Sequence, residues 1–277
     1  MKIGKLLTSL LWCAPLAGYS TDTLAWGLVT HVYFAHSLLW AMPLLDPRLQ
    51  RAIRSFPRLV MAGACLPDLA VVSRRFNHSH YWENAQQMLA NARSDEETAI
   101  AIGYASHLYI DVIAHNHFVP AYEAMWLENS MITHISAEWA MDAYLAPLLE
   151  QSPTQLLLSQ REHLGKFIAP CFNCTPADAM RAITRLAQAD RLLRLSRLPD
   201  MLYRGMHIMD KRLLRNFAFY IARTQTALSH IGALVQGERP LWEPELNHIS
   251  HEQMSRWRKR CLNGLKRRLR MPIDYFS

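Results

Sequence analysis

Hydrophobic residues recur at intervals of three and four along almost the whole chain, and short segments rich in proline and polar residues separate these stretches. Side chains at this spacing share one face of an α-helix. No stretch alternates between hydrophobic and polar residues convincingly enough to indicate a β-strand. The pattern predicts an all-α, multi-helix bundle without internal repeats.

Cap residues and prolines divide this pattern into separate helices. The expected helix starts are Thr30, Asp46-Pro47, Ser94 with Glu97 as a capping box, Ser130 or Thr133, Ser152-Pro153 and Thr175-Pro176. We expect a first helix over 31–41 and a long helix after the capping box that reaches nearly to His117 and ends before Pro120. A last long helix is expected over 203–234, terminated by Gly237.

The length of 277 residues, 51% of them hydrophobic, is enough for one sizeable core. The chain begins MKIGK, continues into an apolar run over 6–17, and has a small residue at Ala25. A basic start, an apolar stretch too short to cross a membrane comfortably and a small residue are typical of an export signal. We therefore predict that 1–25 is an export signal peptide and 26–277 a single domain of a periplasmic or secreted protein. Cleavage would leave Trp26 as the new N-terminus.

Charge is divided unevenly along the chain. Residues 1–150 carry 9 Lys and Arg against 13 Asp and Glu, whereas 151–277 carry 21 against 10. A basic surface attracts anionic lipid or nucleic acid, although a charged face is often simply solvated. The segment RWRKRCLNGLKRRLRM near the C-terminus mixes basic and hydrophobic residues. Such a helix could lie on an anionic membrane, aid solubility, or cover the acidic half of the protein.

Two histidine–carboxylate pairs carry the candidate chemistry. His107 and Asp111, and His134 and Glu138, are each four residues apart within expected helices, so each pair projects from one helical face. Imidazole nitrogen and carboxylate oxygen together suit zinc or a similar divalent ion. Two such pairs in one region of the chain indicate more than one metal and predict metal-assisted hydrolysis.

The order of the histidines and acids is Trp26, His31, Asp68, His80, His107-x3-Asp111-x5-His117 and His134-x3-Glu138. This order, together with the segment GACLPD, resembles the zinc-dependent phospholipase C family, whose fold and metal site are shared with the S1/P1 nucleases. The resemblance extends over 26–145 and implies a helical bundle with three zinc ions. In that family a mature N-terminal tryptophan supplies a ligand through its free amine and carbonyl. The remainder, 146–277, would be a basic helical part of the same domain.

The resemblance implies three ligand sets, namely His80, His107 and Asp111; His31, Asp111 and the Trp26 terminus; and His117, His134 and Glu138. Asp68 would hydrogen-bond the bridging water or help to bind the paired metals, and would orient the nucleophile. Two alternatives stay open, because His78 competes with His80, and because His115 shares the face of the preceding aspartate more naturally than His117 does. The remaining histidines of the chain that we interpret as core residues are His36, His163, His207 and His230.

These observations predict an exported zinc-dependent phosphodiester hydrolase of the phospholipase C type, which acts at a phospholipid membrane and releases diacylglycerol and a phosphorylated headgroup. Zinc would lower the pKa of a shared water and so supply hydroxide for in-line attack. A nuclease or nucleotidase of the S1/P1 type, acting on nucleic acid with the same metals, is the alternative. A membrane-associated metal-binding protein without catalysis is a further alternative. No protein partner is inferred.

Overall fold

The structure is a computed structural model that describes residues 27–41, 45–119, 121–122, 131–238 and 256. Within these ranges the chain forms helices and no strands, as the hydrophobic pattern predicts. The first half contains α2 (Leu28–Ala41), α3 (Pro47–Ser55), α4 (Pro57–Gly63), α5 (Leu69–Val72), η3 (Arg74–Phe76), α6 (Trp82–Asn91), α7 (Asp95–Ile113) and η4 (Ala114–Phe118). The second half contains α9 (Met131–Leu145), η5 (Ala146–Leu148), α10 (Pro153–Ser159), α11 (Arg161–Ile168), η6 (Pro170–Phe172), α12 (Pro176–Ser196), α13 (Leu198–Met209), α14 (Leu213–Leu228) and α15 (Ile231–Val235).

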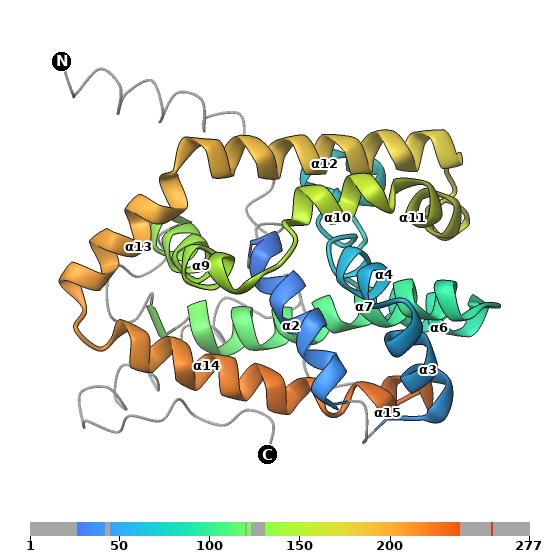
Figure 1. The fold of residues 1–277 in the computed structure, drawn as a ribbon, viewed down its shortest axis with the longest axis horizontal. Coiled ribbons are helices and arrows are strands. Elements are labelled where there is room, and N and C mark those ends of the chain that lie inside the picture. The colour runs from blue at the N-terminus through green and yellow to red at the C-terminus, as the bar shows by residue number, and fades with distance from the viewer. Residues whose placement is uncertain (1–26, 42–44, 120, 123–130, 239–255, 257–277) are drawn as a thin grey trace.

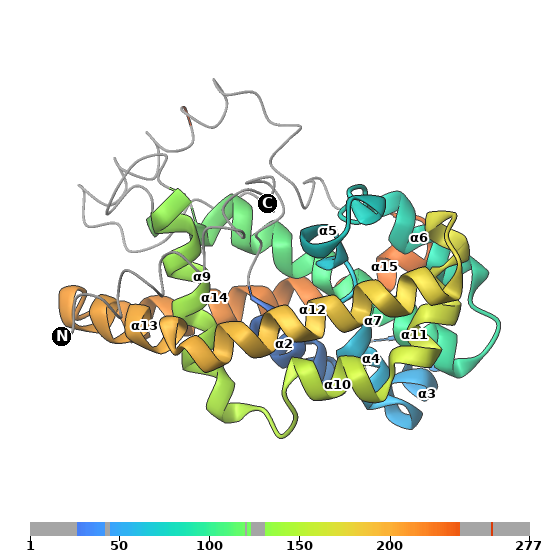
Figure 2. The same cartoon turned by 90° about the horizontal axis from the view of Figure 1, so that it is seen from above.

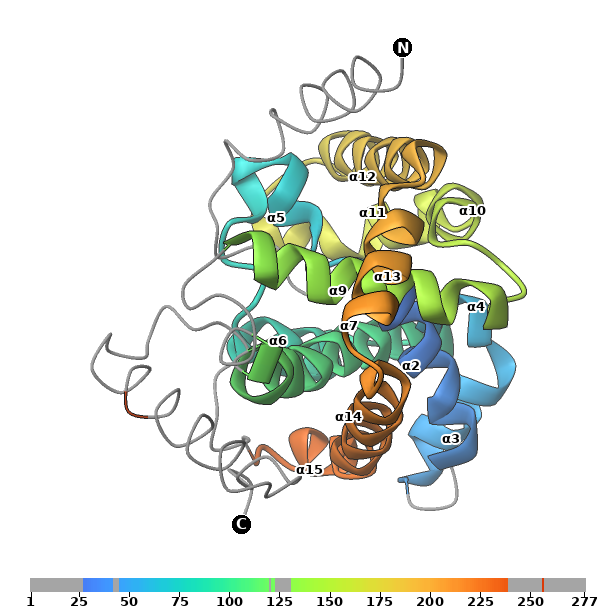
Figure 3. The same ribbon diagram turned by 90° about the vertical axis from the view of Figure 1, so that its left-hand side faces the viewer.

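Helix α7 forms the centre of the bundle. Every residue from Thr98 to Ile113 is buried, so this part of the helix has no face turned to solvent. This is typical of a helix that is surrounded by other helices. Figure 1 shows α12 along the top and α14 along the bottom, with α7 between them. Figure 3 shows the same three levels, with α9 crossing between α12 and α7. Residues 98–113 of α7 are therefore shielded from water on all sides.

Helices α4 and α7 approach each other closely because glycine lies at their crossing. A Cβ atom on Gly103 would overlap the carbonyl oxygen of Val60, and Gly63 on α4 is similarly pressed against the backbone of α7. The absence of side chains at these two positions lets the two backbones touch. This contact brings the carbonyl oxygen of Ala64, directly after α4, within reach of His107 on α7.

Several predicted caps are confirmed. Asp46 accepts a hydrogen bond from the backbone N–H of Arg48, and Ser94 accepts one from that of Glu97. The capping boxes that start α10 and α12 are both formed, by Ser152 and Thr175 together with the residue three positions later. These starts depend on neighbours in sequence, which is why the sequence alone predicts them.

Two predicted helices differ from the structure. The first helix begins at Leu28 and is not capped by Thr30, because the cap comes from the side chain of Asp142 on α9. The single helix expected over 203–234 was wrong, since the chain forms α13, α14 and α15 there. The break follows Asp210, whose carboxylate accepts a hydrogen bond of 2.8 Å from the backbone N–H of Arg212. A local bond of this kind competes with helical hydrogen bonding.

The expected export signal, 1–25, and the basic C-terminal segment, apart from Arg256, lie outside the described residues. Among the helices that are described, none combines the length and the apolar character needed to cross a membrane. Cys171 and Cys174, which form a C-x-x-C in the sequence, are free thiols, and so is Cys65.

Candidate metal centre

Asp111 lies in the middle of a buried cluster of histidines. Its Oδ2 is 2.9 Å from Nε2 of His107 and 3.4 Å from Nε2 of His80. Its Oδ1 is 3.4 Å from Nε2 of His31. All four side chains are almost completely inaccessible to solvent. The two oxygens of one carboxylate therefore face two different sets of imidazoles, which is the arrangement that a carboxylate bridging two cations requires.

Hydrogen bonds at the opposite ring nitrogens orient two of these histidines. Nδ1 of His107 is 2.7 Å from the carbonyl oxygen of Ala64, and because a carbonyl can only accept, this nitrogen carries the proton. Nδ1 of His80 is 3.2 Å from Oγ of Ser79. Each Nε2 is thus turned toward the cluster, as in histidines that bind metals. The two Nε2 atoms are 3.1 Å apart, close to the separation of about 3.3 Å between two nitrogens bound to a tetrahedral zinc.

The loop that carries His80 is anchored at the residue before it. Oγ of Ser79 donates a hydrogen bond to the carbonyl oxygen of Pro67, and the hydroxyl of Tyr104 on α7 donates to the carbonyl oxygen of Ser79. His80 is buried in the cluster as a result. His78, the alternative considered from the sequence, is exposed and lies outside the cluster.

Asp68 lies at the edge of the same cluster, immediately before α5. Its Oδ1 is 3.8 Å from Nε2 of His80 and 3.9 Å from Nε2 of His107. Ligand atoms of His31, Asp68 and His107 all lie within 4.8 Å of one another. Burial raises the pKa of Asp68 well above its usual value, because the carboxylate has lost its hydration. A cation in the cluster would favour the ionised form again.

The imidazoles of this cluster are suited to bind a cation at neutral pH. Burial lowers the pKa of both His80 and His107 below the ordinary value, since the charged form is disfavoured away from water. Both rings are therefore neutral at pH 7 and present a lone pair. Neutral imidazoles combined with carboxylates are the donor set that zinc takes in hydrolytic sites.

A second cluster lies between η4, at the end of α7, and helix α9. Nε2 of His134 is 3.0 Å from Oε1 of Glu138, and Nε2 of His115 is 4.0 Å from the same oxygen. Glu138 is fully buried, and burial raises its pKa to about 7. η4 is a π-helical turn, a geometry that is frequent at functional sites. The three side chains place their ligand atoms within 4.8 Å of one another and form a second set of nitrogen and oxygen donors.

The π-helical turn brings His115, and not His117, to this cluster. Both side chains are buried, but only His115 belongs to the group that includes His134 and Glu138. The family spacing favours His117, which lies six residues after Asp111. The geometry instead favours the alternative that follows from helical periodicity, because a residue four positions after Asp111 stays on the same side of the helix.

Trp26 lies outside the described residues, the first of which is Gly27, just before the helix that carries His31. The interpretation of four other histidines as core residues was wrong, because all of them are exposed: His36, His163, His207 and His230.

The sequence interpretation also missed Asp142. Its signal was present in the spacing of His134, Glu138 and Asp142, which places three ionisable residues on one face of α9.

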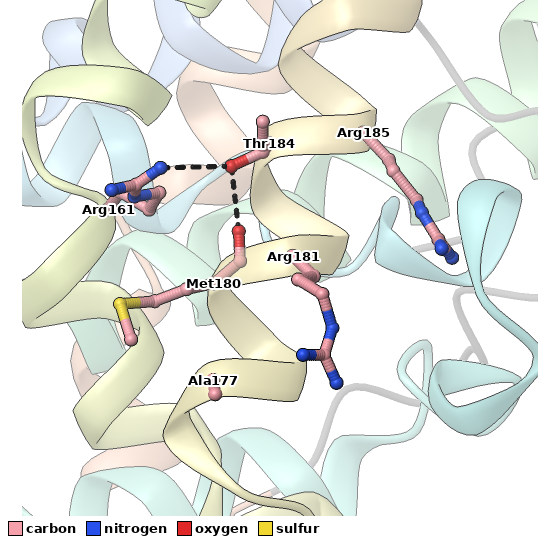
Figure 4. A pocket seen from close by; sticks show the side chains of 6 residues that line it. All are labelled: Arg161, Ala177, Met180, Arg181, Thr184 and Arg185. Atoms are coloured by element: carbon pink, nitrogen blue, oxygen red, sulfur yellow. Dashed lines mark hydrogen bonds between the residues drawn. The ribbon is translucent and has the colours of Figure 1, made fainter.

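A cavity of about 460 Å³ lies between α11 and α12, and its lining residues come from a later part of the sequence than the residues of the two clusters. Figure 4 shows its lining, in which Arg161 donates a hydrogen bond to Thr184 while Arg181 and Arg185 point in other directions. The three guanidinium groups do not converge on one point. None of the residues that line the cavity belongs to the two clusters, so the cavity adds nothing to the metal centre.

Comparison with known proteins agrees with this donor chemistry. A family model described as zinc dependent phospholipase C matches residues 30–189, a range that includes both clusters and more than half of the chain. No curated protein and no solved structure matches the chain significantly. The matched range extends beyond 26–145, where the sequence motifs lie, into α12. The chain belongs to the zinc-dependent phospholipase C family.

Proposed function

We propose that this protein is an exported phospholipase C that hydrolyses phospholipids to diacylglycerol and a phosphorylated headgroup. Membership of the family implies a phosphodiester hydrolase. The observation that carries the proposal is the position of Asp111, whose two oxygens face different histidines in a buried cluster that also contains Asp68. Clustered carboxylates and neutral imidazoles suit hydrated catalytic metals better than a closed structural site.

The proposal assigns the donors to three zinc ions. The ligand sets are His80, His107 and Asp111, with Asp68 beside them; His31, Asp111 and the amine and carbonyl of Trp26; and His115, His134 and Glu138. Removal of residues 1–25 as an export signal would create the free amine that the second set needs.

We further propose that 26–277 is one domain, with a metal core over 26–145 and a basic helical part over 146–277.

When bound, zinc polarises phosphoryl oxygens and lowers the pKa of water toward neutrality. The residues of the chain do the rest. Asp111 would supply the negative charge that lets two cations lie close together in this buried site. Asp68 accepts a hydrogen bond from the attacking water and orients it toward phosphorus. His31 stacks on His107 with ring centroids 3.6 Å apart, which leaves no room for competing water between them. No covalent nucleophile from the protein is required.

An exposed surface on α12, α13 and the turn after α13 supports a lipid substrate. Its large hydrophobic side chains are Leu192, Leu195, Met201, Ile208 and Met209, all more than half exposed. The exposed basic residues among them are Arg191, Arg197, Arg204, Lys211 and Arg212, and Asp200 is the exposed acid in this stretch. We call this the α12–α13 surface; Figure 2 shows α13 and α12 one after the other across the face turned to the viewer. Aliphatic side chains among cations fit an anionic membrane, whereas single-stranded nucleic acid is bound by aromatic stacking.

Hydrolysis assays on two substrates test the proposed function. The mature protein is incubated with phospholipid vesicles and with single-stranded DNA, each with and without a chelator. We expect chelator-sensitive release of phosphorylated headgroup from the vesicles and no cleavage of DNA. Cleavage of DNA without lipid hydrolysis would replace the proposal by the nuclease alternative. If the chelator reduced the hydrolysis of neither substrate, the result would contradict the role of zinc.

The α12–α13 surface is expected to affect vesicles and not soluble substrates. Changing Ile208 and Met209 to serine should weaken binding to anionic vesicles at least about tenfold, since each side chain that enters the membrane contributes about 1.5–3 kcal/mol. Hydrolysis of a small soluble phosphodiester should be unchanged. The matched control changes Leu148 and Leu158, which are also exposed but lie outside this surface. Equal effects of both double variants on vesicle binding would refute the assignment.

His115 and His117 provide a matched pair of substitutions on one π-helical turn. His115→Asn is expected to lower the zinc content by one ion per molecule and to weaken zinc binding at least about tenfold, because it removes a nitrogen donor. His117→Asn should keep the full zinc content. Both side chains are buried to a similar degree, so a general loss of packing would affect both variants alike. The opposite result would restore the ligand predicted from the family spacing.

A further inference from the structure

Asp142 on α9 caps a helix that is far away in the sequence. Its carboxylate accepts hydrogen bonds from the backbone N–H of Thr30 at 2.9 Å, from the Thr30 hydroxyl at 2.7 Å and from the backbone N–H of Val29 at 3.4 Å. The N–H groups in the first turn of a helix have no partner within the helix. A carboxylate at this end also interacts favourably with the helix dipole. The start of α2 is thus held by a side chain from α9.

Gly27 makes this contact possible. A Cβ atom at this position would overlap the carboxylate of Asp142. Only glycine therefore lets the chain pass so close to the carboxylate, and glycine has no side chain with which to cap the helix itself. Asp142 therefore supplies the cap that Gly27 cannot provide. The path of the chain at the start of α2 is set by Asp142.

Arg194 on α12 fixes the carboxylate from the opposite side. Its guanidinium group forms an ion pair with Asp142 and a second one with Asp190, with Nε 3.1 Å from Oδ1 of Asp190. The hydroxyl of Thr154 donates to the other oxygen of Asp190 at 2.8 Å. The fully buried charge of Asp142 is thereby compensated by hydrogen bonds and by a cation. Its side chain is held in one orientation.

The same side chain connects α2 to the metal centre. Asp142 follows Glu138 by four residues, so both side chains project from one face of α9. His31, four residues after Gly27, reaches Asp111 from the first turns of the capped helix. A displacement of the start of α2 would move His31 and the residue that precedes Gly27 relative to the carboxylates on α7 and α9.

We propose that Asp142, held by Arg194, is a positioning residue that fixes the start of the mature chain, so that the amine and carbonyl of Trp26 reach the second zinc. The inference rests on the proposed function, because it requires the processed amine to be a ligand. The carboxylate does not touch the metal itself. It acts through the backbone of the first turn of α2.

The test uses the mature protein beginning at Trp26, with Asp142→Asn compared with wild type and with Asp190→Asn. Asp190→Asn also removes a carboxylate next to Arg194, yet it leaves the contacts with α2 intact. The measurements are zinc per molecule and the rate at which an amine-selective reagent acylates the terminal amine near neutral pH. We expect wild type and Asp190→Asn to hold three zinc ions and to protect the amine. Asp142→Asn should bind the second zinc about 10–100-fold more weakly, as losses of such indirect support do, and should expose the amine to the reagent.

The outcomes separate this inference from the proposed function. If the amine of zinc-loaded wild type reacts freely, it is not a ligand, and that part of the proposed function falls together with the inference. If wild type is protected and Asp142→Asn behaves identically, the inference alone is refuted. An equal loss in Asp190→Asn would also refute it, since the effect would then be a general loosening of α12. Should Asp142→Asn fail to fold, Gly27→Ala displaces the start of α2 without removing a charge and is expected to cause the same zinc loss; full zinc binding in that variant would overturn the proposal.

Discussion

Replacement of Asp111 by asparagine is expected to lower turnover at least about a thousandfold, which corresponds to about 4 kcal/mol of lost transition-state stabilisation. The carboxylate faces two sets of imidazoles with different oxygens. Asparagine has nearly the same volume but no negative charge, so two cations in this buried site would repel each other without compensation. The zinc content should fall together with the rate. Metal analysis and kcat/KM on a soluble phosphodiester measure both effects.

Asp95→Asn is the matched control for this variant. Asp95 lies in the first turn of the same helix and pairs with Arg51 at the surface, with Nε 2.9 Å from Oδ2. Loss of an exposed pair of this kind costs about 0.2–1 kcal/mol of stability and should leave zinc and turnover unchanged. If Asp111→Asn retained both the zinc content and the rate of wild type, the bridging role would have to be abandoned.

Local spacing predicted the parts of the molecule that depend on neighbours in sequence. His107 with Asp111 and His134 with Glu138 share helical faces because they are four residues apart, and the caps at Ser152 and Thr175 act within one turn. These features need no knowledge of tertiary packing. The all-α architecture followed from the same periodicity.

The convergence of distant residues could not be derived from spacing. His31, Asp68 and His80 come from separate elements, and they meet only in the folded bundle, in which α4 and α7 touch at Gly103. The resemblance to the family supplied these residues in advance. It did not supply Asp142, because a cap provided by another helix leaves no local pattern at the start of α2. The choice between the neighbouring histidines on η4 needed the structure, because the family spacing favoured His117 whereas helical periodicity favoured His115.

Removal of zinc is expected to destabilise the fold strongly. A ligand that binds only the folded state stabilises it by about 2.7 kcal/mol at a free concentration one hundred times its Kd. For a chain of this size each such site should raise Tm by about 5–10 °C. The clusters also hold the fully buried carboxylates of Asp111 and Glu138, whose negative charges bound zinc would compensate. Thermal melts at pH 7.5 in chelator should show a large fall in Tm that added zinc reverses.

The stabilisation of the fold by zinc should decrease as the pH falls below 7, because Glu138 then becomes protonated. In the metal-free fold its pKa is raised to about 7, so below pH 7 zinc must displace a proton from the carboxylate in order to bind. The apparent affinity should therefore fall by at least about tenfold, or about 1.4 kcal/mol, for each pH unit well below 7. Above pH 7 the carboxylate is already ionised, and its contribution should level off. The measurement is the Tm with buffered free zinc minus the Tm without zinc, from pH 5 to pH 8. Effects of pH that are the same for the zinc-bound and the zinc-free protein do not change this difference. An equal difference at pH 5 and pH 8, or an unchanged melt in chelator, would show that no metal bound through Glu138 supports this fold.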